Sequence, residues 1–206
     1  MKIDRTIEAI LDKALGEQPI SREEALILMK VDLQSPEMYM LCSVANKLSR
    51  RQFRNYGEIY AQIGLDYAPC PGNCEFCSFG AKHGIVKTVI EYPAEAVVQA
   101  AKFCEDQGAN GLYLMTTARY HPQKYLEVAH AVRQAISTEF PMVANVGDFD
   151  EEYAHQLAEV GFCAIYHAIR LNEGKGTGFS PQRRIRTIEA AKKAGLRLHF
   201  CVEPVG

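Results

Sequence analysis

The stretch IYAQIGLDYAPCPGNCEFC, residues 59–77, joins two patterns that decide the fold. In its first half, apolar residues at every second position from Ile59 to Leu65 alternate with polar or small ones, the period of a β-strand. In its second half, three cysteines fall within eight residues. The stretch therefore predicts a strand that ends in a loop carrying closely spaced thiols.

Downstream of this stretch, four segments each read as a helix followed by a short apolar strand. Gly108, Gly161 and Gly195 mark helix ends, and Ser180-Pro181 marks a helix start. The predicted helices span 93–107, 122–137, 150–160 and 181–194, and the predicted strands span 111–115, 142–146, 164–169 and 196–202. Strands and helices in this order, with short connections, require right-handed crossovers and a parallel sheet. In such sheets ligands bind at the carboxyl ends of the strands.

We therefore predict an α/β fold, a partial TIM-type β/α barrel of about four βα units plus a fifth strand. Residues 1–57 form a helical N-terminal segment, because Ser21 and Glu24 make a capping box and Ser35-Pro36 starts a further helix. Residues 58–206 form the N-terminal part of the barrel. A complete eight-stranded barrel needs ~200–250 residues. We expect either a fragment or an open half-barrel, and no activity from this truncated chain alone.

Composition narrows the class of protein. The formal net charge is −2 and the pI is near 6.3, which supplies no basic surface for nucleic acid or anionic lipid. No run of about 18 apolar residues and no signal peptide is found, so we expect a cytoplasmic protein. Seven cysteines are an odd number, which argues against a disulfide framework and favours a metal role for the clustered three.

The clustered cysteines are Cys70, Cys74 and Cys77, with spacing C-x3-C-x2-C. Closely spaced soft thiolates on one loop suit a cubane iron–sulfur cluster, and three of them leave one iron open for a ligand. The alternative is a structural zinc ion, with His83 as the fourth ligand of a Cys3His set. That alternative describes a zinc-stabilised binding module without catalysis.

The motif, with the aromatic Phe76 before its third cysteine and its place after the first strand, resembles the radical S-adenosylmethionine (SAM) superfamily. The resemblance implies a [4Fe–4S] cluster whose open iron chelates SAM. It also implies reductive cleavage of SAM to a 5′-deoxyadenosyl radical, which abstracts hydrogen from a small-molecule substrate. A reducing electron donor such as flavodoxin or ferredoxin is implied as well.

Within the superfamily the chain looks most like the biotin synthase branch, which includes the [FeFe]-hydrogenase maturase and methylornithine synthase. Tyr166 to Arg170 and the later Arg184 match that branch in spacing. The match implies that Arg184 binds the SAM carboxylate; the alternative is one more exposed basic residue on a helix. Thr116 and Thr117 stand where many members carry Gly-Gly-Glu for the SAM ammonium. The match also implies that Glu173 contacts the ribose of SAM.

The predicted substrate-facing residues are Asn145, Arg170 and Glu203, at the ends of three strands. Alternation along strand 164–169 and beyond puts Arg170 inside the barrel and His167 on the other face. A buried guanidinium needs an anion, which Glu173, Asp148 or an anionic substrate could supply. Asp148 is also interpreted as a loop residue or helix cap.

Three positions depart from biotin synthase, which holds a second, sulfur-donating cluster on cysteines of three strands. The matching positions are Leu114 and Val143, which cannot bind iron, and Cys201, which lies near the third. One thiolate cannot hold that cluster, so the departures disfavour biotin synthesis itself. A maturase-like or mutase-like member acting on a small amino-acid-derived substrate is the alternative within enzymes.

Overall fold

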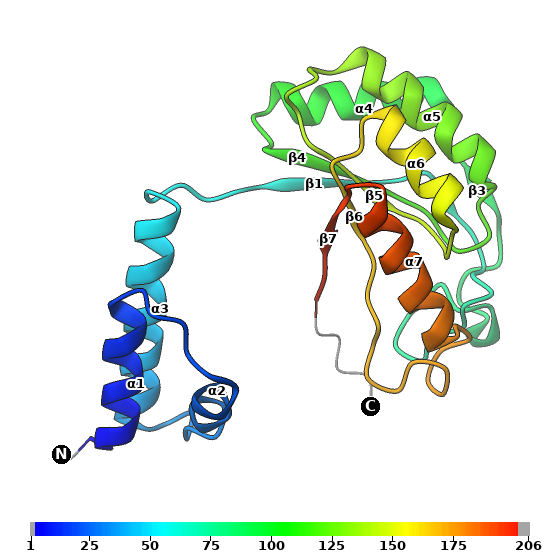
Figure 1. Cartoon of the computed structure of the whole chain (residues 1–206). Coiled ribbons are helices and arrows are strands. Elements are labelled where there is room, and N and C mark those ends of the chain that lie inside the picture. The colour runs from blue at the N-terminus through cyan, green and yellow to red at the C-terminus, as the bar shows by residue number, and fades with distance from the viewer. Residues whose placement is uncertain (1–2, 202–206) are drawn as a thin grey trace. The chain divides into compact units, whose positions relative to one another are not determined.

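The computed structural model describes residues 3–201 and divides the chain into two compact units, Met1–Gly57 and Glu58–Gly206 (Figure 1). The first unit is helical and the second is α/β. The boundary falls where the apolar spacing of the sequence changes from helical to strand-like. Each unit is described by itself below.

The helical unit is built on three capped helices. Asp4 accepts backbone hydrogen bonds at the start of the first helix, and Ser35 does so at the start of the third. Ser21 and Glu24 form the predicted capping box, each side chain accepting the other residue's N–H. The helices are α1 (Arg5–Leu15), α2 (Arg22–Leu28) and α3 (Pro36–Gln52).

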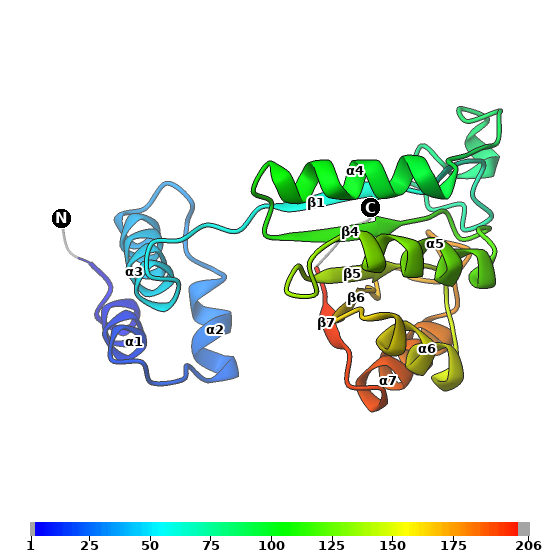
Figure 2. The same cartoon turned by 90° about the horizontal axis from the view of Figure 1, so that it is seen from above.

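The second unit is a five-stranded parallel sheet in the order β1-β4-β5-β6-β7, with one helix in each crossover. The strands are β1 (Tyr60–Gly64), β4 (Gly111–Met115), β5 (Met142–Asn145), β6 (Ala164–Tyr166) and β7 (Arg197–His199). The helices are α4 (Ala94–Asp106), α5 (Pro122–Ala135), α6 (Glu151–Val160) and α7 (Pro181–Lys193). All four helices lie on one side of the sheet (Figures 1 and 2). The predicted α/β class and parallel strand order are confirmed.

Two features differ from the sequence prediction. Strand β6 ends at Tyr166 instead of residue 169, and the residues that follow it line a cavity. Strand β7 spans Arg197–His199 and so ends before residue 202. A small antiparallel ribbon of β2 (Asp66–Tyr67) and β3 (Ile90–Glu91), and a short 3₁₀ helix, η1 (Ala81–His83), were not predicted. Elements of two or three residues are too short to show a period in the sequence.

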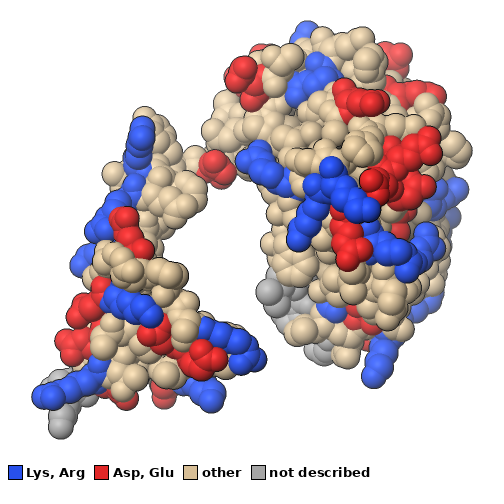
Figure 3. Space-filling model, in the orientation of Figure 1, with Lys and Arg blue, Asp and Glu red and all other residues tan. Residues whose placement is uncertain are grey.

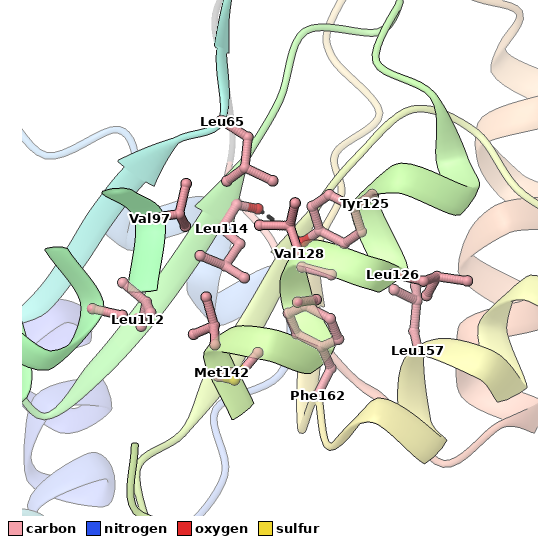
Figure 4. Close-up of a cluster of buried hydrophobic side chains, with 14 of the residues drawn as sticks. Leu65, Val97, Leu112, Leu114, Tyr125, Leu126, Val128, Met142, Leu157 and Phe162 are labelled. Carbon is pink, nitrogen blue, oxygen red and sulfur yellow. Dashed lines mark hydrogen bonds between the residues drawn. The ribbon is translucent and has the colours of Figure 1, made fainter. Parts of the chain in front are cut away.

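The main core lies between the sheet and its helices (Figure 4). Tyr125 of α5 is fully buried, stacks on Phe162 with ring centroids 5.7 Å apart, and donates a hydrogen bond of 3.0 Å to the carbonyl of Leu114. Leu114 therefore faces the helices, and its predicted place at a second-cluster position inside the barrel is wrong. Because side chains alternate along a strand, the neighbours that face the other way are Tyr113 and Met115.

The opposite face of the sheet carries aromatic and polar side chains. The hydroxyl of Tyr113 lies 2.7 Å from Nδ1 of His199, and the ring of Tyr113 meets those of Tyr60 and Tyr166 edge to face. The Tyr166 hydroxyl lies 2.8 Å from Sγ of Cys201. Among the described residues, three tyrosines therefore lie together on this face, with the Cys201 thiol beside one of them.

The surface charges are mixed. On the face of the Glu58–Gly206 unit seen in Figure 3, lysines and arginines are interspersed with aspartates and glutamates, in keeping with the net charge of −2. Between residues 3 and 201, none of the helices combines the length and the apolar character that crossing a membrane requires.

The core makes a direct prediction for stability. Leu157 of α6 is fully buried, so Leu157→Ala should lower the free energy of unfolding by about 2–5 kcal/mol, because a cavity replaces the lost side chain. Urea unfolding followed by circular dichroism measures the change. Leu171→Ala, at a leucine that is 61% exposed, is the matched control and should cost much less. Equal losses in the two variants would contradict the packing described.

Candidate functional site

A cavity of about 470 Å³ opens at the carboxyl ends of β1, β4, β5 and β6. This is the edge at which parallel α/β sheets bind ligands. Nine of the predicted site residues line it together: Cys70, Cys74, Phe76, Cys77, Thr116, Thr117, Asn145, Arg170 and Arg184. Glu173 lies beside it, paired with Arg170, and Glu203 lies outside the described residues.

The cysteine loop, residues 70–77, is held by backbone hydrogen bonds at its first cysteine. The N–H of Cys70 donates to the carbonyl of Phe79 at 2.6 Å, and the Cys70 carbonyl accepts from Ala81 at 3.0 Å. Asn73 takes a positive φ of 46°, which asparagine tolerates, and its side chain accepts from the N–H of Lys82. The loop thus turns sharply and directs its thiols toward one cavity.

The three thiols fit a cubane cluster chemically. Cys70 and Cys77 are half-buried and Cys74 is buried, and all three are free of disulfides. Burial raises the pKa of the Cys74 thiol, and the nearby Arg170 guanidinium opposes that rise. Soft ligands lining one wall of a cavity, with room left opposite them, match what an iron–sulfur cluster with an open iron requires.

His83, the fourth ligand of the zinc alternative, has another partner. Its Nε2 lies 3.0 Å from the carbonyl oxygen of Cys74, so the ring is engaged with the backbone of the loop. Within residues 3–201, no three His, Cys, Asp or Glu side chains gather around a point where a single metal ion could sit. In a cubane each thiolate binds its own iron, so the thiols surround the cluster instead of meeting at one ion.

Arg184 is buried in the wall of the cavity, so its interpretation as an exposed basic residue is wrong. It is 6% exposed, because the buried face of α7 recurs at Arg184, Thr187 and Ala191. Its guanidinium packs over the ring of Phe179, 4.2 Å from the centroid. One Nη lies 3.0–3.2 Å from the two ring nitrogens of His167. Its Nε is buried without a hydrogen-bond partner among the described residues.

Behind Arg184 lies a buried ion network. Nε2 of His167 is 3.2 Å from the carboxylate of Asp148, and that carboxylate is 3.8 Å from the Arg184 guanidinium. Burial lowers the pKa of His167 although the hydrogen bond to Asp148 opposes this, so the neutral ring is favoured. Burial would raise the pKa of Asp148, but His167 and Arg184 bring it below its ordinary value. A neutral ring can donate to Asp148 and accept from Arg184.

Two predictions about this network need correction. His167 was placed on the face away from the cavity, but the strand ends at Tyr166, so the alternation does not continue and His167 lines the cavity. Asp148 is a loop residue between β5 and α6, as one of its interpretations stated, but it is not the helix cap. Asp150 caps α6 by accepting from the N–H of Tyr153, and Asp148 turns inward to His167.

Arg170 lines the cavity and has an internal anion. Its guanidinium lies 3.6 Å from the carboxylate of Glu173 and 5.5 Å from the ring centroid of Phe76. The same carboxylate accepts from the backbone N–H of Arg170 at 2.8 Å. The charge of Arg170 therefore does not by itself require an anionic substrate. Glu173, whose oxygens face its own loop, does not line the cavity as the ribose role implied.

The end of β4 meets a residue that the sequence did not single out. Asp66, buried at the start of β2 and two residues beyond β1, accepts from the N–H of Thr117 at 2.7 Å and from its hydroxyl at 2.5 Å. The Thr116 hydroxyl points to the carbonyl of Asn145 at 3.4 Å. Asp66 therefore places a carboxylate in the cavity wall. The available signal was its position just beyond a strand end, four residues before Cys70.

Comparison with known proteins agrees with this geometry. The sequence model of the radical SAM superfamily matches residues 67–206. Biotin synthase of Aquifex aeolicus is 26% identical over 209 residues, covering 95% of this chain and 61% of its own length. Biotin synthase of Carboxydothermus hydrogenoformans is 27% identical over 203 residues, covering 93% and 61%.

Two solved structures share the fold. HydG, a maturase of the [FeFe]-hydrogenase, superposes with a TM-score of 0.82 at 17% identity, over 98% of this chain and 47% of its own. Methylornithine synthase (PylB) gives 0.79 at 17% identity, over 94% and 58%. The chain thus spans about three-fifths of the length of these biotin synthases. Because the family match covers more than half of the chain and includes the loop with the three cysteines, the chain belongs to the radical SAM superfamily.

Proposed function

We propose that the complete protein is an enzyme that holds a [4Fe–4S] cluster on Cys70, Cys74 and Cys77 and uses it to cleave SAM reductively. The observation that carries the proposal is the pairing, in one cavity, of three thiols with a buried arginine that has an unpaired Nε. Thiols supply ligands for the cluster, and the arginine supplies a donor for an anionic part of the cofactor.

The charges of the cavity suit the amino-acid end of SAM. Arg184 is more than nine-tenths buried, and an unpaired donor at such depth is costly unless a ligand accepts from it. A carboxylate is the matching acceptor, because guanidinium groups bind carboxylates with directed hydrogen bonds. Asp66, in the same cavity, offers a carboxylate to an ammonium group. Thr117 hydrogen bonds to Asp66 and fixes its direction.

Each group has a separate task in this proposal. The bound cluster, reduced by a partner such as a flavodoxin or ferredoxin, would supply the electron that yields a 5′-deoxyadenosyl radical from SAM. The cysteine loop holds the cluster at the cavity wall. The network of Asp148 and His167 holds the Arg184 guanidinium in place from behind. Thr116 and Thr117 line the cavity where the SAM ammonium would lie, and Asn145 and Arg170 line the space for a small substrate.

The side chains on the face of the sheet opposite the helices favour a reaction other than sulfur insertion. Where a second cluster would need thiolates, the described face of the sheet carries Tyr113, Met115 and Val143. The Cys201 thiol also lies beside this face, where it contacts the Tyr166 hydroxyl. We propose a biotin-synthase-like radical enzyme that acts on a small molecule and does not make biotin.

The cluster proposal predicts a defined metal content. After anaerobic reconstitution, the chain should hold about four irons and four sulfides, because three thiolates on one loop suit a cubane. Cys70→Ala, Cys74→Ala and Cys77→Ala should each lose the cluster, measured by iron and sulfide assays and by absorbance near ~400 nm, where thiolate-bound clusters absorb.

His83→Ala is the matched control for the cysteine variants. It should keep its iron, since the His83 ring contacts the Cys74 carbonyl and not the cavity. Iron loss in this variant, together with bound zinc in the wild-type chain, would contradict the cluster and revive the Cys3His site.

Arg184 makes a prediction for binding of the cofactor. In the reconstituted chain, Arg184→Lys should weaken SAM binding about 10- to 100-fold. Lysine lacks the planar guanidinium, so a charge-assisted hydrogen bond to the SAM carboxylate is lost. Equilibrium dialysis under anaerobic conditions measures the affinity, and iron content should be unchanged. Arg186→Lys, on the exposed side of the same helix, should bind SAM as the wild type does. Unchanged affinity in Arg184→Lys would remove Arg184 from the cofactor site.

A further inference from the structure

A second loop lies against the cysteine loop. It comprises residues 170–180 between β6 and α7, and we call it the glycine loop because it carries Gly174, Gly176 and Gly178. The N–H of Gly178 donates to the carbonyl of Gly72 at 2.6 Å. The N–H of Glu75 donates to the carbonyl of Gly176 at 3.0 Å. Two main-chain hydrogen bonds therefore join the loops, one on each side of Cys74.

The close approach of the two loops depends on missing side chains. A Cβ on Gly178 would lie 3.0 Å from the Gly72 carbonyl oxygen and 3.2 Å from that of Pro71. Both are backbone atoms, so they cannot rotate away. A Cβ on Gly72 would lie 2.3 Å from the ring of Phe179. Glycine therefore favours the close approach at both positions: a side chain at 178 would press on the backbone of the cysteine loop, and one at 72 would displace the Phe179 ring.

The glycine loop is itself braced by a buried polar pair. Thr177 donates its hydroxyl hydrogen to the Glu173 carboxylate at 2.5 Å. The same hydroxyl oxygen accepts from the N–H of Gly174 at 3.2 Å and from that of Phe179 at 3.4 Å. Both Glu173 and Thr177 are buried. One hydroxyl therefore ties the two ends of the glycine turn to the carboxylate at its base.

We infer that the glycine loop is the brace that fixes the conformation of the cysteine loop, with Thr177 and Gly178 as positioning residues that act through Cys74. Cys70 is anchored independently, by its hydrogen bonds to Phe79 and Ala81. Cys74 lies between the two inter-loop bonds and is 8% exposed. Loosening the brace should therefore release Cys74 first. The inference concerns the protein fold around the thiols and holds whether or not a cluster is bound.

The test is the reactivity of each thiol in the metal-free chain. The chain is treated with a maleimide reagent under reducing, metal-free conditions, and labelling is followed at each cysteine by mass spectrometry. A buried thiol reacts only when its segment opens, so its rate reports the local opening equilibrium. Thr177→Val keeps the shape and removes the hydroxyl, and should speed labelling of Cys74 about tenfold, the effect of one lost buried hydrogen bond.

Three comparisons make the result specific. Thr177→Ser restores the hydroxyl and should restore slow labelling of Cys74. Gly178→Ala should speed Cys74 labelling as Thr177→Val does, whereas Gly57→Ala, at a glycine with nothing within 4 Å of an added Cβ, should not. Cys104 on α4, in the main body of the sheet unit, should keep its wild-type rate in every variant.

A second readout follows on the reconstituted protein. If the brace sets the cysteine loop, Thr177→Val should release iron to a chelator faster than Thr177→Ser does and should shift the cluster reduction potential. Unchanged Cys74 labelling in both Thr177→Val and Gly178→Ala would overturn the inference. So would equal acceleration at Cys74 and Cys104, which would mean general destabilisation. Failure of the wild-type chain to take up iron would overturn the proposed function, while the thiol result would still decide the brace.

Discussion

Parallel pairing of the five strands is the constraint on which the rest of the structure depends. Because each strand must run in the same direction as its neighbour, each connection crosses the sheet and every carboxyl end meets at one edge. The helices cover one side, where Leu114 and Tyr125 form the core. The loops collect at the carboxyl edge, and this brings Cys70 on the first strand's loop next to Arg184 at the start of the last helix.

Burial of Arg184 is the second determinant of the site. Taking a guanidinium out of water costs on the order of several kcal/mol. Ion pairs and hydrogen bonds with buried partners must offset this cost. Asp148 supplies charge, His167 supplies an acceptor, and Phe179 supplies a ring face. None of these three residues binds the Nε of Arg184. The contacts that hold the rest of the guanidinium also fix the direction of this Nε–H. The cavity also contains three thiols and the Asp66 carboxylate. It therefore suits a cofactor that carries both a carboxylate and an ammonium group.

Much of this arrangement could be predicted from the sequence. The two-residue and helical periods locate β1, β4, β5 and all four helices to within a few residues, and the cysteine spacing identifies the loop. The failures have physical causes. Strand β6 is three residues long, so alternation beyond Tyr166 misplaced His167. For Arg184 the sequence left a site residue and an exposed basic residue open as alternatives, because its packing against Phe179 involves a loop without any period.

Particular side-chain contacts were also not predicted by the sequence patterns. Glu173 was assigned both to the SAM ribose and, as an alternative, to Arg170; the pairing with Arg170 is present, whereas its hydrogen bond with Thr177 was not foreseen. Asp66 was overlooked because a single aspartate after a strand is common, and its role depends on Thr117, 51 residues away. The residue types thus indicated which chemical groups are present, whereas the folded structure determines which of them form hydrogen bonds and ion pairs with each other.

In the function proposed here, three thiolates hold a cubane with one iron left open for SAM. Mössbauer spectroscopy of the ⁵⁷Fe-reconstituted chain, with and without SAM, tests it most directly because each iron contributes its own signal. We expect a four-iron cluster in which adding SAM shifts the signal of one iron in four and leaves the other three unchanged. Four irons that do not respond to SAM, or a chain that binds zinc and takes up no cluster, would contradict it.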